Sequence, residues 1–200
     1  MPQVQTDVMG KRKKRDLNNA SKKEKAMQIY SKDFLSYGKE YKITFGHQNF
    51  TLGRGKLAIG KKLPDTKGLM TPSLTAPYFI RGKRKLILTV PSIDTPVCES
   101  QIKELSGSVD EYYDITGREV YVVSVDTPYA QARFIKDNNI NERINFISAF
   151  ADDNFLYASG LCVLELNVFA RSAIECDERD IVTNVYITKD ITHIPLIAHM

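Results

Sequence analysis

Apolar and polar residues follow two different periods in the middle of the chain. Residues 85–90 (KLILTV) form a short apolar run, which predicts a buried strand. Residues 119–125, rich in Val, predict a second one. Between them, residues 97–115 carry apolar side chains at i, i+3, i+7 and i+10, which predicts a helix with one buried face: Ile102, Leu105, Val109 and Tyr112. Together these segments predict a βαβ unit with parallel strands and a right-handed crossover.

Shorter patterns lie on both sides of this unit. Residues 41–45 and 49–52 predict an N-terminal β-hairpin, and residues 168–176 and 181–187 predict a second hairpin. Pro128 and Asp152 begin segments that predict two further helices, ending near residues 138 and 159. We therefore predict an α/β protein with a mixed central sheet flanked by helices.

Charge separates the first 40 residues from the rest. Residues 1–40 hold 10 Lys or Arg against 5 Asp or Glu, whereas residues 41–200 hold 18 against 19. We expect residues 1–40 to be a basic, partly disordered extension and residues 41–200 to be the folded domain. A capping box at Ser21 predicts a short helix in the extension, with Met27, Tyr30, Phe34 and Tyr37 on one face. Lys11 to Arg15 are a candidate contact for nucleic acid or an anionic membrane, although a solvated tail is the simpler interpretation.

Composition excludes several classes of protein. The chain has 200 residues, of which 42% are hydrophobic, enough for one full core. No apolar run approaches the ~20 residues of a membrane span, and no secretory signal is visible, so we expect a soluble, cytoplasmic protein. The three cysteines form no CxxC pair, and with three His they offer no metal-ligand spacing. We expect neither a metal nor an organic cofactor.

The segment from Pro91 to Cys98 (PSIDTPVC) joins the first buried strand to the long helix. Pro96 suits the first helical position, which puts Cys98 in the first turn. Unpaired N–H groups and the helix dipole favour an anion there, so the pattern predicts an activated thiolate. The alternative is a buried structural cysteine. Asp126 and Tyr129 lie at the same predicted sheet edge, and we interpret Asp126 as part of a helix cap.

Residues 41–195 resemble the thiol peroxidases of the atypical two-cysteine peroxiredoxin family. The resemblance rests on KITFG at 42–46, GKRK at 82–85, PSIDTPVC at 91–98, VSVDTPYAQARF at 123–134, FARSA at 169–173 and DIT at 190–192. It implies a three-layer thioredoxin-like fold, reduction of hydrogen peroxide and organic hydroperoxides, thioredoxin or another thiol as reductant, and a homodimer.

The resemblance also implies roles for single residues. Cys98 would attack the peroxide and become a sulfenic acid. Thr95 would hydrogen-bond the thiolate or peroxide, beside its role as a helix cap, and Pro91 would shield the sulfur from water. Arg171 would stabilise the thiolate and polarise the departing oxygen. The alternatives are a strand terminator for Pro91 and a surface strand residue for Arg171.

One position departs from the family. Members carry a resolving cysteine directly after the Arg-Phe of the helix that follows the second strand, and Ile135 stands there. That leaves Cys162, Cys176, a second subunit or an outside thiol. If residues 168–176 form an unbroken strand, Cys176 points away from Arg171 and is a core residue. Cys162 is better placed, but a one-cysteine cycle with an external thiol is the simplest mechanism.

A second class of function fits the same residues. A thioredoxin-fold redox sensor or binding module would also contain an oxidisable Cys98 and no resolving cysteine. A catalyst consumes many equivalents of peroxide when a thiol is present, whereas a sensor stops after about one. Turnover therefore separates the two hypotheses.

Overall fold

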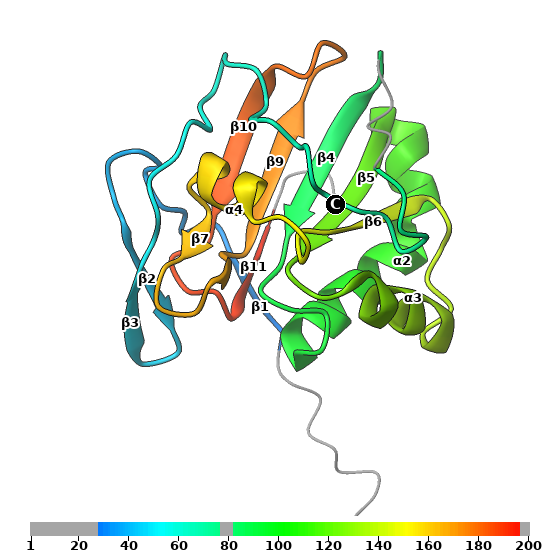
Figure 1. Ribbon diagram of the computed structural model, residues 1–200, viewed down its shortest axis with the longest axis horizontal. Helices are drawn as coiled ribbons and strands as arrows, with labels where there is room; N and C mark the ends of the chain where they lie inside the picture. The colour runs from blue at the N-terminus through cyan, green and yellow to red at the C-terminus, as the bar shows by residue number, and fades with distance from the viewer. Residues whose placement is uncertain (1–27, 77–81, 197–200) are drawn as a thin grey trace, which may run out of the picture.

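The computed structural model describes residues 28–76 and 82–196, and Figure 1 shows their arrangement around one central sheet. The sheet has five strands in the order β10-β9-β4-β5-β6. Their bounds are β4 Arg84–Thr89, β5 Arg118–Ser124, β6 Ile144–Ser148, β9 Ser172–Cys176 and β10 Val182–Ile187. The first three strands run parallel, while β9 is antiparallel to β4 and to β10. The mixed sheet is confirmed.

Two helices cover one face of this sheet: α2, Pro96–Thr116, and α3, Pro128–Asp137. The βαβ unit predicted from the periodicity is β4, α2 and β5, with Leu86 opposite Val120 in the parallel pair. The buried face of α2 contains the four predicted apolar residues together with Cys98 and Gln101. The helix ends at Gly117, whose φ of 63° is the left-handed conformation that glycine adopts without strain. The residues buried between these helices and the sheet form one apolar core, which we call the Cys98 core. It also includes Leu88 of β4 and Phe134 of α3.

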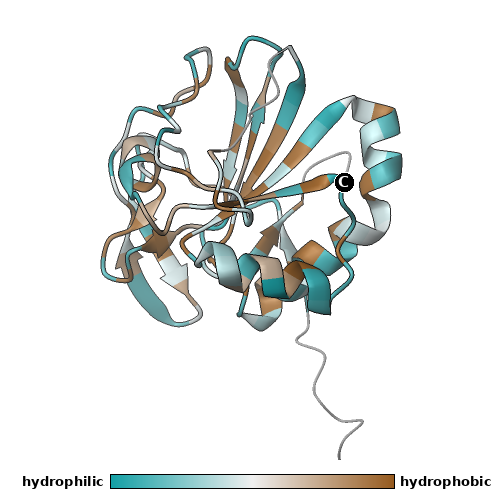
Figure 2. Ribbon diagram, turned by 45° about the vertical axis from the view of Figure 1, so that its right-hand side comes forward, coloured by the Kyte–Doolittle hydropathy of each residue, from teal (hydrophilic) through white to brown (hydrophobic). Residues whose placement is uncertain are grey.

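The opposite face is covered by smaller elements. They are the hairpin of β2 Lys42–Phe45 and β3 Gln48–Thr51, the helix α4 Asn154–Ser159, and the pair of β7 Cys162–Val163 and β8 Val168–Phe169. Ile43, Phe155 and Val163 are buried there against alternate residues of the sheet, such as Ile87. We call this the second core. Figure 2 shows apolar segments concentrated in the central strands, whereas much of the hairpin and the exposed turns is hydrophilic.

In the described part of the N-terminal extension, residues 28–40, there is one short strand and no helix, so the expected helix is wrong in these residues. β1, Ile29–Ser31, pairs in parallel with β11, His193–Pro195. Tyr30 lies opposite Ile194, and Phe34 makes an isolated bridge with Thr188. Pairing with the far end of the chain overrides the helical spacing of the aromatic residues. The capping box at Ser21 and the basic run Lys11 to Arg15 lie outside the described residues.

The strand expected over residues 168–176 is interrupted. β8 pairs with β7 beside the second core, whereas β9 joins the central sheet. Ala170 and Arg171 lie between the two strands, and the Ala170 N–H donates to the Leu161 carbonyl, 2.7 Å away. The chain passes from one sheet to the other at Arg171. The alternation of side-chain direction along a strand therefore cannot be used to compare Arg171 with Cys176.

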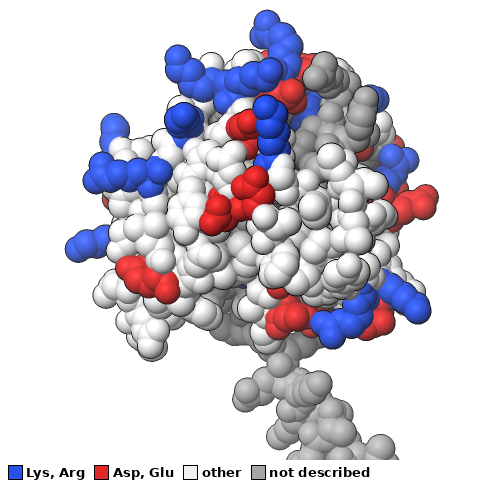
Figure 3. Space-filling view, in the orientation of Figure 1, with Lys and Arg blue, Asp and Glu red and all other residues white. Residues whose placement is uncertain are grey.

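Charged side chains are mixed on the face drawn in Figure 3, where Lys and Arg gather along the upper rim and Asp and Glu lie among them. No helix within residues 28–76 and 82–196 is long and apolar enough to cross a membrane. In the same residues, no three His, Cys, Asp or Glu side chains are grouped so that they could hold a metal ion.

Candidate active site

Cys98 lies where the sequence pattern predicts, in the first turn of α2. Pro96 is the first helical residue, and Thr95 is the N-cap with extended backbone angles. The Cys98 side chain is 0% exposed and packs in the core between α2 and the sheet. The helix start therefore presents its N–H groups near a sulfur that is shielded from water.

Arg171 reaches this sulfur from the two-residue segment between β8 and β9. Its Nη2 donates to Cys98 Sγ at 3.1 Å, its Nη1 to Gln101 Oε1 at 2.5 Å, and its Nε to the Ile191 carbonyl at 2.8 Å. The arginine is 1% exposed, so it is not a surface strand residue. A planar guanidinium held by three acceptors in a buried site has one orientation, with a positive charge against the sulfur.

Gln101 is a site residue that the sequence reasoning missed. It is 3% exposed and lies one helical turn after Cys98, on the same face of α2. The available signal was its position: a polar residue three places after the cysteine falls on the buried face of the predicted helix. Its side-chain oxygen accepts from Arg171, which fixes the distance between the guanidinium and α2.

Thr95 and Pro91 lie in the loop that leads into α2. The Thr95 hydroxyl donates to the Ser92 carbonyl at 3.1 Å, and its side chain does not accept a hydrogen bond from the start of the helix. Pro91 is half-buried directly after the end of β4. The structure thus places both residues in the loop that leads to Cys98, while their roles toward peroxide stay predictions.

Asp126 holds this loop through hydrogen bonds. From the sequence we interpret it only as part of a helix cap. Its carboxylate accepts from Ser92 Oγ at 2.8 Å and from the Ile93 N–H at 2.9 Å. The cap of α3 is Thr127, whose hydroxyl oxygen accepts from the Ala130 N–H at 3.1 Å. Because Asp126 follows β5, it ties the Cys98 loop to the neighbouring strand of the sheet.

Cys162 and Cys176 lie in the second core, on the opposite face of the sheet from Cys98. Burial raises the pKa of both thiols, that of Cys176 to about 12. The Cys162 thiol donates to Asn167 Oδ1 at 3.8 Å. Ile135, by contrast, packs from α3 against the Cys98 core. The position where a resolving cysteine was expected therefore lies on the same side of the sheet as Cys98, whereas the two other cysteines do not.

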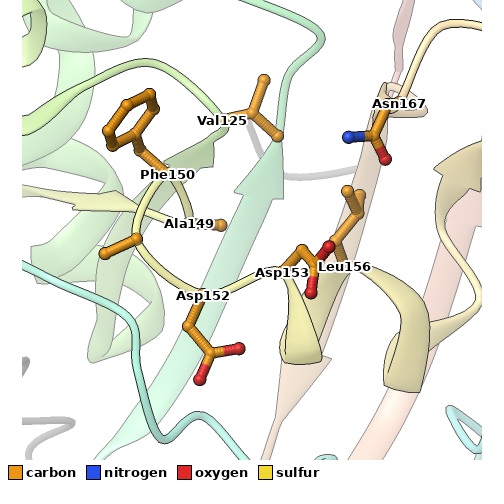
Figure 4. Close-up of a pocket in the computed structure, with 8 residues that line it drawn as sticks. Val125, Ala149, Phe150, Asp152, Asp153, Leu156 and Asn167 are labelled. Carbon is orange, nitrogen blue, oxygen red and sulfur yellow. The ribbon is translucent and has the colours of Figure 1, made fainter.

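A pocket of about 520 Å³ lies at the carboxyl ends of β5 and β6, and Figure 4 shows its lining side chains. It is bounded by Val125, Phe150, Asp152, Asp153 and Asn167, among others. Its apolar wall residues Ala149 and Leu156 belong to the second core. This pocket therefore borders the second core rather than the Cys98 core.

Comparison with known proteins identifies this arrangement. Residues 55–183 match the model of the AhpC/TSA family, and this span includes Cys98 and Arg171. The chain belongs to the AhpC/TSA family. The thiol peroxidase of Bacillus subtilis (strain 168) is 32% identical over 156 residues, which are 76% of this chain and 89% of the relative. The thiol peroxidase of Halalkalibacterium halodurans is 33% identical over 156 residues, 76% of this chain and 90% of that protein.

Solved structures show the same fold. A peroxiredoxin-like protein from Aquifex aeolicus superposes with a TM-score of 0.69 at 27% identity, covering 78% of this chain and 91% of that one. The thiol peroxidase from Chromobacterium violaceum, at 16% identity, has a TM-score of 0.68 over 78% of this chain and 90% of its own. The thioredoxin-like peroxiredoxin fold and membership among the thiol peroxidases are thus confirmed.

Proposed function

We propose that this thiol peroxidase runs a one-cysteine cycle, in which Cys98 reduces hydrogen peroxide or an organic hydroperoxide and an external thiol restores it. The observation that carries the proposal is the contact of 3.1 Å between the buried Arg171 guanidinium and Cys98 Sγ. A positive charge fixed at this distance in a site of low dielectric stabilises a thiolate and a departing oxyanion.

In the first step the Cys98 thiolate attacks the terminal oxygen of the hydroperoxide. A sulfur–oxygen bond forms, the oxygen–oxygen bond breaks, and an alkoxide or hydroxide leaves and takes a proton from water. The sulfur is oxidised to a sulfenic acid and the peroxide is reduced. Because Cys98 has no exposed surface, peroxide enters by a local opening of the loop between β4 and α2.

Thr95 and Pro91 act in this step through the same loop. In the absence of substrate the Thr95 hydroxyl donates a hydrogen bond to the Ser92 carbonyl, 3.1 Å away. When peroxide enters, the hydroxyl donates this hydrogen bond to the substrate oxygen instead. Pro91 has no N–H to attract water and covers the site at the end of β4. Asp126 holds the loop from β5 while this exchange occurs.

In the second step a reducing thiol attacks the sulfenic acid. Water leaves, a mixed disulfide forms, and a second thiol releases Cys98 as a thiol and forms the disulfide of the reductant. Ile135 cannot perform this step, and Cys162 and Cys176 lie in the core on the other side of the sheet. We therefore assign the resolving thiol to an external partner, for which thioredoxin is the first candidate.

We propose a homodimer as the working form. Tyr129 and Phe150 follow β5 and β6 and are 70% and 64% exposed, which is unusual for large aromatic side chains. Burial of such rings between two subunits removes apolar surface from water. Light scattering at micromolar concentration measures the assembly, and replacing Tyr129 and Phe150 with Ser should weaken it.

The first experiment is intact mass spectrometry after one equivalent of hydrogen peroxide, with and without dimedone, on wild type, Cys98→Ser and Cys162→Ser. The one-cysteine cycle predicts a dimedone adduct that requires Cys98 and is unaffected by Cys162→Ser. Loss of two hydrogens that Cys162→Ser abolishes would assign resolution to Cys162 instead. No oxidation of Cys98 would overturn the proposal.

Turnover is the second readout, because it distinguishes a catalyst from a sensor. Wild type with excess thioredoxin and its reductase should consume many equivalents of peroxide, and dithiothreitol should replace thioredoxin at a lower rate. A single equivalent consumed with either reductant would favour a redox sensor.

A further inference from the structure

The orientation of Arg171 depends on two separate parts of the chain. Helix α2 supplies Cys98 and Gln101, and the segment before β11 supplies the Ile191 carbonyl. If α2 moved relative to that segment, the guanidinium would have to leave one of its three acceptors. Whatever holds these two parts together therefore also holds the positive charge at the sulfur.

Strand β1 connects these two parts. On one side it lies beside β11 (Figure 1), with which it pairs. The Leu196 N–H also donates to the Ser31 carbonyl at 2.9 Å. On the other side, Tyr30 of β1 and Gln28, directly before the strand, bond α2: Gln28 Nε2 donates to Ser100 Oγ at 2.5 Å, and the Tyr30 hydroxyl donates to the Glu104 carboxylate.

The two residues of α2 that form these hydrogen bonds lie on either side of Gln101 in the sequence. Ser100 precedes it directly, and Glu104 lies close to one turn after it. Burial and the hydrogen bond to Glu104 raise the pKa of Tyr30 to about 12, so the hydroxyl stays protonated and remains a donor at neutral pH.

A small cavity beneath β1 explains why Gln101 needs this support. Its volume is about 70 Å³, and its walls include Tyr30, Gln101, Glu104, Leu105, Ile194 and Pro195. Among the described residues, the buried Gln101 Nε2 has no hydrogen-bond partner. The Gln101 amide is thus held through its oxygen alone, and the cavity beside it gives it space to turn once the hydrogen bond between Tyr30 and α2 is lost.

We propose that Tyr30 and Gln28 are positioning residues for Cys98, which act through α2 to keep Gln101 and Arg171 against the sulfur. β1 and β11 lie outside residues 55–183, the span that matches the family model. The inference rests on the proposed function of Cys98, and its test includes a reaction that does not require peroxidase activity.

The test measures two rates at Cys98 as a function of pH: oxidation by hydrogen peroxide and alkylation by iodoacetamide, both followed by mass spectrometry. The variants are Tyr30→Phe, Glu104→Ala, their combination, and Glu104→Gln, which keeps a side-chain oxygen as acceptor. Tyr113→Phe is the matched control, because Tyr113 lies on the same helix and its ring packs against Arg143 rather than β1.

We expect Tyr30→Phe and Glu104→Ala each to slow oxidation about tenfold, since a displacement of ~1 Å at a reacting centre costs up to ~10²-fold. The double variant should be no slower than either single variant, Glu104→Gln should retain most of the rate, and the control should match wild type. The pH at which alkylation reaches half its maximal rate should rise in the slow variants, because Arg171 then stabilises the thiolate less.

Unchanged rates in Tyr30→Phe and Glu104→Ala would overturn the inference. So would slower oxidation with an unchanged pH profile and a lower melting temperature, which is the signature of a merely structural strand. If wild type fails to react with peroxide while alkylation still depends on Tyr30, the proposed function falls and the positioning role stands.

Discussion

Replacement of Arg171 by Lys keeps the positive charge and removes the planar fork. The guanidinium donates to Cys98 Sγ, Gln101 Oε1 and the Ile191 carbonyl in three directions. A lysine ammonium is a point charge on a flexible stem and cannot reproduce that geometry. At least one of the two buried oxygens loses its donor, and the charge is no longer fixed at the sulfur.

The magnitude follows from these contacts. Removal of one donor aimed at developing charge costs ~10²- to 10³-fold in rate, or roughly 3–4 kcal/mol in the barrier, and we expect a loss in this range for Cys98 oxidation. A buried acceptor left without its donor costs about 1–3 kcal/mol in the free energy of unfolding. For a chain of 200 residues this lowers the melting temperature by roughly 3–10 °C.

Stopped-flow oxidation of Cys98 by hydrogen peroxide, well below the melting temperature, measures the rate. Arg118→Lys is the matched control: Arg118 Nη2 pairs with Glu175 Oε2 at 3.3 Å, also within the sheet, and touches no residue of the Cys98 site. Its stability should fall slightly and its oxidation rate should not change. A folded Arg171→Lys protein that oxidises Cys98 within threefold of wild type would refute the role given to the guanidinium.

Three further changes test other parts of the site. Ile135→Cys should convert the cycle to an intramolecular one: after one equivalent of peroxide the mass falls by two hydrogens and the dimedone adduct disappears, whereas Ile140→Cys, in the same core, should not do this. Asp126→Ala removes the acceptor of Ser92 Oγ and the Ile93 N–H and should cost about 2 kcal/mol in unfolding free energy and slow peroxide consumption, with Asp126→Asn in between. Burial raises the pKa of Asp190, but hydrogen bonds from Thr192, Thr44 and Gly46 outweigh it and leave that pKa below its ordinary value of 3.8. The ionised carboxylate therefore stabilises the fold above pH 3.8, and this stabilisation is lost as the pH falls through the folded pKa. Urea unfolding should give Asp190→Asn a lower free energy of unfolding than wild type at pH 7. The difference between the two proteins should shrink in acid.

Local patterns predicted the part of the structure that carries the cysteine. The apolar run of β4, the spacing of the buried residues of α2 and the proline at its start are properties of neighbouring residues, and each matches the structure. The same holds for α3 and for the hairpin of β2 and β3. Helix caps and hydrophobic periods depend on separations of two to four residues, which a single sequence displays.

Long-range pairing accounts for the errors. The aromatic spacing near Tyr30 is helical, but the partner of this segment is β11, at the other end of the chain. The apolar run around Arg171 gives no sign that its two halves join different sheets. Gln101 has a role only through its contact with Arg171, and Asp126 only through its contact with Ser92. Both contacts join residues far apart in the sequence, so they cannot be predicted from local patterns.

The parallel pairing of β1 with β11 also sets an order of events during synthesis. β1 leaves the ribosome before the strands of the central sheet and β11 after them, so β1 and β11 cannot meet until the residues between them have been synthesised. The Ile191 carbonyl that holds Arg171 belongs to the same late segment. A growing chain can thus form β4, α2, β5 and β6 first, but its reactive sulfur acquires its full set of contacts only after Ile191 has been synthesised.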